Sequence, residues 1–151
     1  MDATLERALT WVLAIALVLS LGGVVAIAVN PPDTSPPFTE MYVLGPDGNA
    51  SGYPTALAPG ETGTVIVGIS NHEDREVSYD LLVTWNGTVT QTRTVTVADG
   101  ATRELRLTLT APPREGEYRV RFLLFKGDPG GEPYRYLRLF VDVGLNRTTT
   151  R

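Results

Sequence analysis

The stretch VSYDLLVTWNGTVTQTRTVTV, residues 77–97, decides the fold of this chain. Its first nine residues alternate apolar and polar side chains, which is typical of a half-buried β-strand. Asn86-Gly87 separates this run from the threonine-rich run 88–97, and Asn-Gly between two such runs favours a two-residue hairpin turn. The sequence therefore predicts an antiparallel pair of strands, 77–85 and 88–97, with Trp85 pointing into the core.

Similar alternating runs lie on both sides of this hairpin. They are bounded by turn residues, and the strands that they predict are 40–44, 62–70, 103–109, 118–126 and 134–143. Segment 52–60 carries two prolines, so we expect it to be irregular. Seven short strands with no helix among them predict an all-β domain, a seven-stranded immunoglobulin-like β-sandwich. Tyr118, at the start of the sixth strand, predicts a tyrosine corner, in which the hydroxyl binds the backbone upstream.

An apolar stretch precedes the predicted sandwich: ALTWVLAIALVLSLGGVVAIAV, residues 8–29, which contains no charge. At about 1.5 Å per residue a helix of this length spans roughly 33 Å, enough for a hydrocarbon core of about 30 Å. It predicts one N-terminal transmembrane helix, with membrane lipid as its partner. Two alternatives stay open. Ala26-Ile27-Ala28 would suit cleavage of a signal peptide, which would leave a secreted β-sandwich, and a buried core helix is the other.

The flanks of the apolar stretch predict its orientation. Arg7 precedes the stretch, and the next basic residue is Arg75, so the positive-inside rule places the N-terminus in the cytoplasm. The expected organisation is a cytoplasmic N-terminus (1–7), a transmembrane helix (8–29), a Pro-rich stalk (30–37), an extracytoplasmic immunoglobulin-like β-sandwich (38–143) and a flexible tail (144–151). The N-x-Ser/Thr pattern predicts glycosylation at Asn49, Asn86 and Asn146.

Composition excludes several classes of function. The chain has no cysteine, which removes thiol catalysis and cysteine-ligated zinc, and its net charge of −4 argues against a nucleic-acid surface. His72 is the only histidine, whereas catalytic metal sites need three protein ligands. The turn Asp47-Gly48-Asn49 resembles a fragment of a calcium loop but lacks the later acidic ligands. We therefore expect no enzyme, no catalytic, cofactor-binding or metal-binding residue, and no cofactor.

One surface suggests an interaction. Arginine combined with aromatic side chains suits contacts with carbohydrate, anionic polymer or protein. We expect such residues on the outward faces of the last two strands, namely Arg119, Arg121, Phe125, Arg135, Tyr136, Arg138 and Phe140. The alternative is that the arginines pair with acids on neighbouring strands and that the aromatic rings pack under loops.

Several motifs also resemble a known family. They are PFTEMYVLG (37–45), Tyr53-Pro54, Gly60-Glu61, VGISNHE (67–73), Val77, Tyr79, LFK (124–126) and the run from Tyr136-Leu137 to Val143. Together they are similar to the domain of unknown function 1616 (DUF1616) family of archaeal membrane proteins, over roughly residues 36–143. The resemblance implies an archaeal envelope protein without catalytic residues. It also implies that Asn71, His72 and Glu73 serve a turn.

These observations predict a non-enzymatic, membrane-anchored protein of the cell envelope. Its β-sandwich would lie outside the cell and contact an envelope protein, a glycan or a second copy of itself. A different hypothesis is an accessory subunit of a membrane enzyme or transporter. That subunit would dock through its helix, where Gly22 and Ala26 have the small-xxx-small spacing that permits close helix contact.

Overall fold

The structure is a computed structural model that describes residues 2–31 and 35–144. The chain divides into two compact units, one within Met1–Pro36 and one within Pro37–Arg151. The predicted stalk lies partly outside the described residues. The predicted tail lies outside them except for Gly144, and so does the sequon at Asn146.

The first unit contains one helix, α1 (Ala3–Val29). It begins before the apolar stretch because Leu5, Glu6 and Arg7 are good helix formers, and it ends at Val29, with Asn30 as its C-cap ahead of a proline. None of its residues is buried, so its apolar side chains have no protein cover. With 27 residues it is long and apolar enough to cross a membrane. The prediction of an N-terminal apolar helix of spanning length is thus confirmed.

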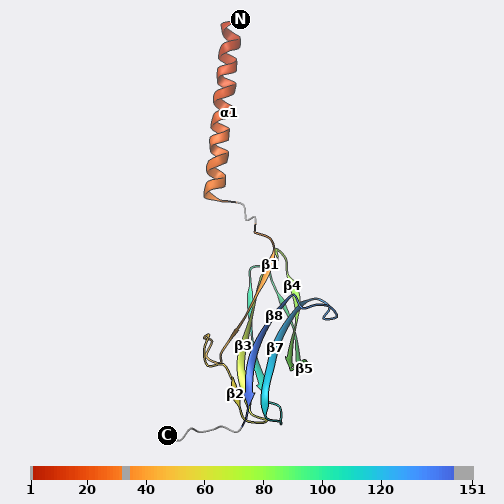
Figure 1. Cartoon of the computed structure of the whole chain (residues 1–151). Helices are drawn as coiled ribbons and strands as arrows, with labels where there is room; N and C mark the ends of the chain where they lie inside the picture. The colour runs from red at the N-terminus through yellow and green to blue at the C-terminus, as the bar shows by residue number, and fades with distance from the viewer. Residues whose placement is uncertain (1, 32–34, 145–151) are drawn as a thin grey trace. The chain divides into compact units, whose positions relative to one another are not determined.

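The second unit is a β-sandwich of two sheets (Figure 1). The three-stranded sheet has the order β1 (Phe38–Leu44), β3 (Thr62–His72), β6 (Thr102–Thr110). The five-stranded sheet has the order β2 (Ala56–Leu57), β8 (Arg135–Val143), β7 (Gly116–Lys126), β4 (Val77–Trp85), β5 (Thr88–Val97). Neighbouring strands are antiparallel except β2 and β8, which are parallel. The predicted class, an all-β immunoglobulin-like sandwich, is confirmed.

The one addition to the predicted strands is β2, in the segment expected to be irregular. Ala56 pairs with Asp142 and Leu57 with Val143, so the segment lies along the end of β8. Backbone bonds beside it, Asp142 N to Thr55 O and Gly144 N to Leu57 O, continue this pairing. A strand of two residues is too short to show alternation in a sequence, which is why the pattern of this segment does not reveal it.

The side chains between the two sheets form one core, as the alternation predicts. Its largest fully buried members are Tyr79, Phe122, Ile69, Leu81, Leu107, Leu109 and Leu124. Trp85 is 5% exposed and meets Tyr118 edge to face with ring centroids 5.8 Å apart. The Tyr118 hydroxyl donates to the backbone oxygen of Arg114 at 3.0 Å, which confirms the tyrosine corner.

The central hairpin also forms as predicted. Strands β4 and β5 end and begin at Trp85 and Thr88, and Asn86 and Gly87 both have positive φ, 47° and 93°. Positive φ at both central residues is the signature of the tight turn whose twist matches the flanking strands. The turn also contacts β7, since Asn86 Oδ1 accepts a hydrogen bond from the backbone N–H of Arg119 at 2.8 Å.

Candidate interaction face on strands β7 and β8

The outer face of β7 and β8 carries the side chains that point away from the core. Strand pairing places Arg119 opposite Phe140, Arg121 opposite Arg138, and Leu123 opposite Tyr136. Because successive residues of a strand alternate between faces, these six belong to one face. The structure therefore brings together five of the seven residues of the predicted surface. We call Arg119, Arg121, Tyr136, Arg138 and Phe140 the Arg–aromatic face.

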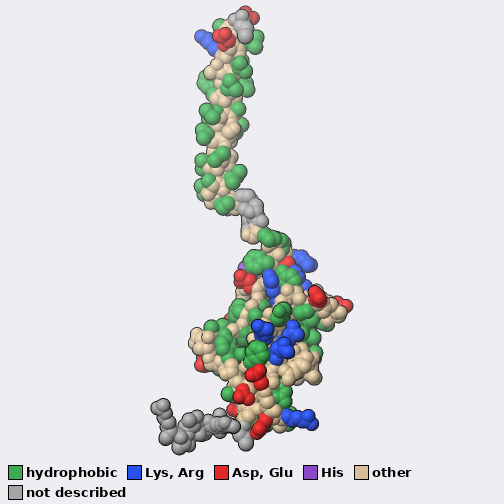
Figure 2. Space-filling model, in the orientation of Figure 1, with side chains coloured by type: hydrophobic (Ala, Val, Ile, Leu, Met, Phe, Trp, Pro, Cys, Tyr) green, Lys and Arg blue, Asp and Glu red, His purple; other side chains and the backbone are tan. Residues whose placement is uncertain are grey.

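Two contacts organise the side chains of the Arg–aromatic face. The guanidinium of Arg121 lies 5.1 Å from the centroid of the Tyr136 ring, and that of Arg138 lies 5.9 Å from the Phe140 ring. The two rings remain 55% and 50% exposed. In Figure 2 blue side chains gather over β7 and β8 with apolar ones beside them. The face thus offers guanidinium donors held against half-exposed rings.

The arginines of this face lack an anion. Arg121 and Arg138 are direct cross-strand neighbours, a like-charge arrangement that costs stability. Within residues 2–31 and 35–144 the structure contains one ion pair, and it lies elsewhere, between Lys126 and Glu73. The predicted alternative, in which the arginines pair with acids on neighbouring strands, is therefore not what the described residues do. The charge of the face is left for solvent or for a partner.

An orphaned hydroxyl lies beside the arginine pair. Thr84 is the cross-strand neighbour of Arg121 on β4 and is 3% exposed. Among the described residues its Oγ1 is the buried side-chain oxygen without a hydrogen-bond partner. A buried hydroxyl without a partner costs about 1–3 kcal/mol. The strip around Arg121 thus combines two local costs, a like-charge pair and an unsatisfied polar group.

The two remaining residues of the predicted surface do not belong to it. Arg135 has the parity of the inward-facing Leu137, and its Nε donates to the backbone oxygen of Thr39 at 3.2 Å. The outward assignment of Arg135 was wrong, because Arg135 and Leu137 are two residues apart on one strand and therefore share a face. Phe125 has the outward parity but is only 5% exposed, so its ring cannot meet a partner.

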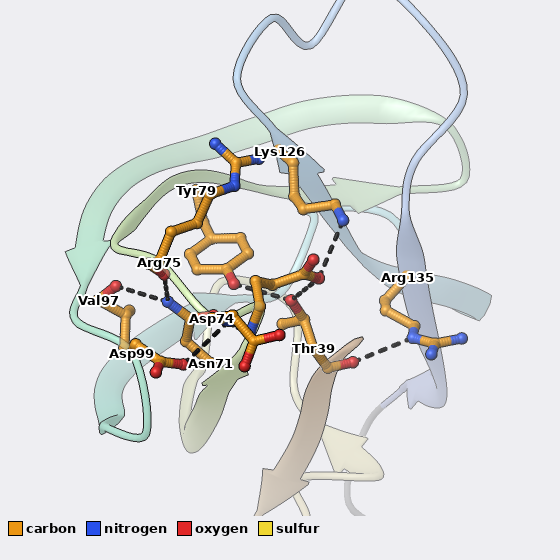
Figure 3. A network of polar contacts seen from close by, with 10 residues as sticks. Thr39, Asn71, Asp74, Arg75, Tyr79, Val97, Asp99, Lys126 and Arg135 are labelled. Atoms are coloured by element: carbon orange, nitrogen blue, oxygen red, sulfur yellow. Dashed lines mark hydrogen bonds and ion pairs between the residues drawn. The ribbon is translucent and has the colours of Figure 1, made fainter. Parts of the chain in front are cut away.

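A buried polar network lies at the end of the sandwich where β1 begins (Figure 3). Thr39 Oγ1 donates to Glu73 Oε1 at 2.7 Å, and Lys126 Nζ lies 2.9 Å from the same oxygen. Since the Thr39 hydrogen is used on Glu73, the Tyr79 hydroxyl donates to Thr39 Oγ1, at 2.7 Å. Lys126 Nζ also lies 3.6 Å from the centroid of the Tyr134 ring. The network joins both sheets through β1, β4 and β7.

The network sets the ionisation of its members. Burial alone would raise the pKa of Glu73, but the hydrogen bonds from Lys126 and Thr39, together with the charge of Lys126, outweigh it and lower the pKa. Burial raises the pKa of Tyr79, and the negative charge of Glu73 adds to that rise. Glu73 is thus held as a carboxylate and Tyr79 as a neutral phenol. With the carboxylate bound by Thr39 and Lys126, the arrangement is suited to stability rather than to chemistry.

The turn at Asn71 behaves as the family resemblance implies. Asn71 Oδ1 accepts from the backbone N–H of Glu73 at 2.9 Å, while its Nδ2 donates to the backbone oxygens of Arg75 and Val97. His72 is exposed and stacks on Phe38 with ring centroids 4.7 Å apart. Glu73 does more than serve the turn, because its carboxylate reaches Thr39 and Lys126. Nothing in the sequence marks Thr39 or Lys126 as a partner of Glu73, apart from the fact that Lys126 is the sole lysine beside twelve arginines.

An apolar cleft of about 390 Å³ opens between β1 and β8. Its lining residues are Met41, Tyr42, Val43, Tyr53, Phe122, Leu137, Arg138 and Leu139. The Tyr53 hydroxyl donates to the backbone oxygen of Val43 at 3.0 Å and so fixes one wall. The described residues contain no group of three or more His, Cys, Asp or Glu that could hold a metal ion. The cleft therefore offers mainly apolar contact.

Two of the three predicted glycosylation sites lie in the described part of the chain. Asn49 and Asn86 are both exposed and both lie in turns between strands. Asn86 uses its Oδ1 on the backbone of Arg119, which leaves its Nδ2 toward solvent as the atom that a glycan would need. Modification at either position stays a prediction.

Comparison with known proteins adds the following. A family model described as "Domain of unknown function (DUF1616)" matches residues 32–142, which cover the whole sandwich up to the end of β8. No curated protein matches the chain. The family description names no activity, so the match fixes a family without supplying a reaction.

Solved structures similar to this chain share its fold. The CARDB domain of a Pyrococcus furiosus protein, crystallised in complex with di-metal ions, has a TM-score of 0.52 at 18% identity over 71% of this chain and 93% of that one. A chain of the human seminal-plasma complex of zinc α2-glycoprotein and prolactin-inducible protein has a TM-score of 0.52 at 8% identity, over 74% and 99%. Escherichia coli α2-macroglobulin has 0.51 at 16% identity, over 72% of this chain and 17% of that chain. At these identities the likeness concerns the β-sandwich alone.

Proposed function

The chain belongs to the DUF1616 family, and from that premise we propose that it is a non-enzymatic, single-pass membrane protein of the cell envelope. In this proposal α1 stays in the membrane, and the sandwich lies outside the cell and presents the Arg–aromatic face to a binding partner. The family match together with a β-sandwich behind an N-terminal apolar helix fits a membrane-anchored extracellular domain.

The observation that carries the proposal is the exposure of α1. All of its 27 residues lack burial, and its residues 8–29 include no charge. A helix that is apolar on every side is stable only within protein or lipid, because water around such a surface is unfavourable. The structure offers it no protein cover among the described residues, so lipid is the environment that suits it.

Two further observations support the position of the sandwich. Arg7 precedes the apolar stretch 8–29 and no basic residue follows that stretch before Arg75, which favours translocation of the C-terminal part. The sequons at Asn49 and Asn86 lie in exposed turns, where an extracytoplasmic transferase would reach them. The absence of an enzymatic role is supported by the lone His72, which stacks on Phe38 instead of joining a catalytic group.

A protease experiment tests membrane retention and orientation together. Intact cells or spheroplasts that express the full chain would be treated with protease, and fragments would be detected with antibodies against residues 1–7 and against the sandwich. We expect loss of the sandwich signal and a membrane-bound fragment that keeps residues 1–7. A protected sandwich would reverse the orientation. A secreted protein whose mass lacks the helix would establish the signal-peptide alternative.

A second candidate function is an accessory subunit that docks through α1. Gly22 and Ala26 lie one helical turn apart, and a Cβ added at Gly22 would meet nothing within 4 Å, so a neighbouring helix could approach closely there. Exchange of α1 for an unrelated membrane anchor separates the two functions. Partners that persist after the exchange are bound by the sandwich, whereas partners that are lost were bound by the helix.

A further inference from the structure

We infer that the partner of the Arg–aromatic face is the same face of a second copy of this chain, packed with its strands antiparallel. The inference rests on the proposed function, because it names the partner of the face described there. It starts from the order of charges along β7 and β8. Glu117 lies opposite Asp142, Arg119 opposite Phe140, and Arg121 opposite Arg138.

These three levels form a symmetrical pattern. Each strand carries an acid and an arginine that are four residues apart, with one residue of the same face midway between them. At about 3.4 Å per residue the two charges of one strand lie roughly 14 Å apart. Arg121 and Arg138 are therefore too distant from Glu117 and Asp142 of their own copy to pair, and the structure shows no ion pair among these four described residues.

A two-fold axis between two copies would bring these opposite charges together. The axis would run across the strands, in the plane between two facing copies, at the level of Arg119 and Phe140. It places Arg121 of one copy opposite Glu117 of the other, and Arg138 opposite Asp142. The match follows from the equal spacing of the two charges on either side of the axis, and it is the same for both copies, as an isologous interface requires.

Such a contact would offset the like-charge pairs at the two outer levels of the face. The basic pair Arg121 and Arg138 of each copy would face the acidic pair Glu117 and Asp142 of the other. Arginine binds carboxylates with two parallel hydrogen bonds. Arg119 would lie opposite Arg119 of the second copy, and each of these two arginines would have Glu117 of its own copy on one side along the strand and Glu117 of the other copy on the opposite side. Phe140, half exposed in the single copy, would meet its counterpart at the axis. Arginine and aromatic residues are the types enriched in protein interfaces.

The same pattern argues against other partners. An acidic polysaccharide would be attracted by the arginines but repelled by Glu117 and Asp142 on the same face. A peptide that adds a strand to a sheet needs a free strand edge, whereas β7 is paired with β4 and β8 on its two sides. With a second copy, both the arginines Arg121 and Arg138 and the acids Glu117 and Asp142 of this face would meet opposite charges.

Charge reversal in two sets tests the inference. Set one carries Arg121→Glu and Arg138→Glu, and set two carries Glu117→Arg and Asp142→Arg, each in the full chain in detergent micelles. Since the chain has no cysteine, Ala50→Cys provides one exposed position for donor or acceptor dyes. We expect energy transfer between wild-type copies, and roughly tenfold or greater weakening of the dissociation constant within each set alone. Mixing set one with set two should restore wild-type affinity.

A matched control excludes an effect of net charge. Arg93→Glu with Arg103→Glu makes the same change of charge at exposed positions outside the face, and we expect it to leave association unchanged. Circular dichroism would establish that all variants are folded. Failure of the mixed sets to associate, or an absence of association in the wild type, would overturn the inference.

Cross-linking gives a second measurement that needs no charge reversal. Facing sheets lie about 10 Å apart, too far for a disulfide, so a bismaleimide of about that length would be used with single cysteines. Phe140→Cys lies at the axis and should cross-link to its copy. Val89→Cys, equally exposed at 50% but away from the axis, should not. Equal yields would contradict the arrangement. Protease protection of the sandwich in cells would overturn the proposed orientation and leave these results in vitro unaffected.

Discussion

Two places in the sandwich bring charged side chains together, and they differ in whether the charges are matched. At the network, Lys126 meets the carboxylate of Glu73, which also accepts from Thr39. On the outer face, Arg121 stands beside Arg138 without an anion among the described residues. The comparison separates two uses of charge. A matched, partly buried pair holds two sheets together, whereas an unmatched pair on the outer face weakens the free domain and becomes favourable only when a partner supplies the opposite sign.

The interior of the sandwich sets the energy scale for this comparison. In the fragment 36–143, which we expect to unfold cooperatively, Trp85→Ala should lower the free energy of unfolding by about 3–5 kcal/mol, because the ring fills the core. Phe140→Ala, an aromatic truncation on the outer face, should cost less than about 1 kcal/mol. Urea unfolding followed by circular dichroism measures both. A wild-type midpoint for Trp85→Ala would remove that residue from the core.

Removal of the Lys126 cation from the buried network tests the comparison directly. Lys126→Met keeps an apolar stem but leaves the Glu73 carboxylate buried without its counter-charge, so we expect a loss of about 1–3 kcal/mol in the free energy of unfolding. Denaturant titration of the fragment with Trp85 fluorescence as the probe gives the value, since Trp11 lies outside the fragment. A loss below about 0.5 kcal/mol would mean that the two places are alike.

The pH dependence of stability should come from the matched pair. Because the pKa of Glu73 is lowered in the folded state, its contribution is fully present above the pKa of the unfolded chain and is lost as the pH falls through the lowered value. Stability should therefore fall below about pH 4. In Glu73→Gln that part of the acid sensitivity should disappear. Denaturation midpoints of both proteins, measured from neutral to acidic pH, would test this. If Glu73→Gln lost stability with pH as steeply as the wild type, the acid sensitivity would not come from Glu73.

The smallest effect is expected for the unmatched pair. Arg121→Met removes a like-charge repulsion and also the contact with the Tyr136 ring, two effects of similar size and opposite sign. The free energy of unfolding should change by less than about 0.5 kcal/mol. Added salt should stabilise the wild type more than the variant, because salt screens the repulsion. A loss as large as that of Lys126→Met would show that Arg121 has a partner within its own copy.

Much of the fold follows from local pattern. The bounds of β4 and β5 agree with the predicted 77–85 and 88–97, because an Asn-Gly turn and period-two alternation fix both the strands and their connection. Tyr118 at a strand start was enough to predict a corner. The strand β2 was not predictable, since its two residues carry no period of their own and are ordered by the neighbouring β8.

The candidate face was predictable in part. Alternation along β7 and β8 assigned Arg119, Arg121 and Arg138 to the outside, because parity alone decides which face a side chain joins. Arg135 was misplaced although the same rule applies to it, because it lies two residues before the inward-facing Leu137 and so shares its face. Phe125 has the outward parity, but it is buried. Whether an outward side chain is covered depends on the segments around it, which the pattern of its own strand does not show.

The sequence by itself determined the apolar helix, the alternation of the strands and the sign of every charge. Only the tertiary structure decided which charges share a level. That Arg121 stands beside Arg138, and that Glu73 meets Lys126, depends on pairing between segments far apart in the chain. Periodicity gives the face of a side chain, whereas its neighbours across strands depend on register and on packing of the whole sandwich.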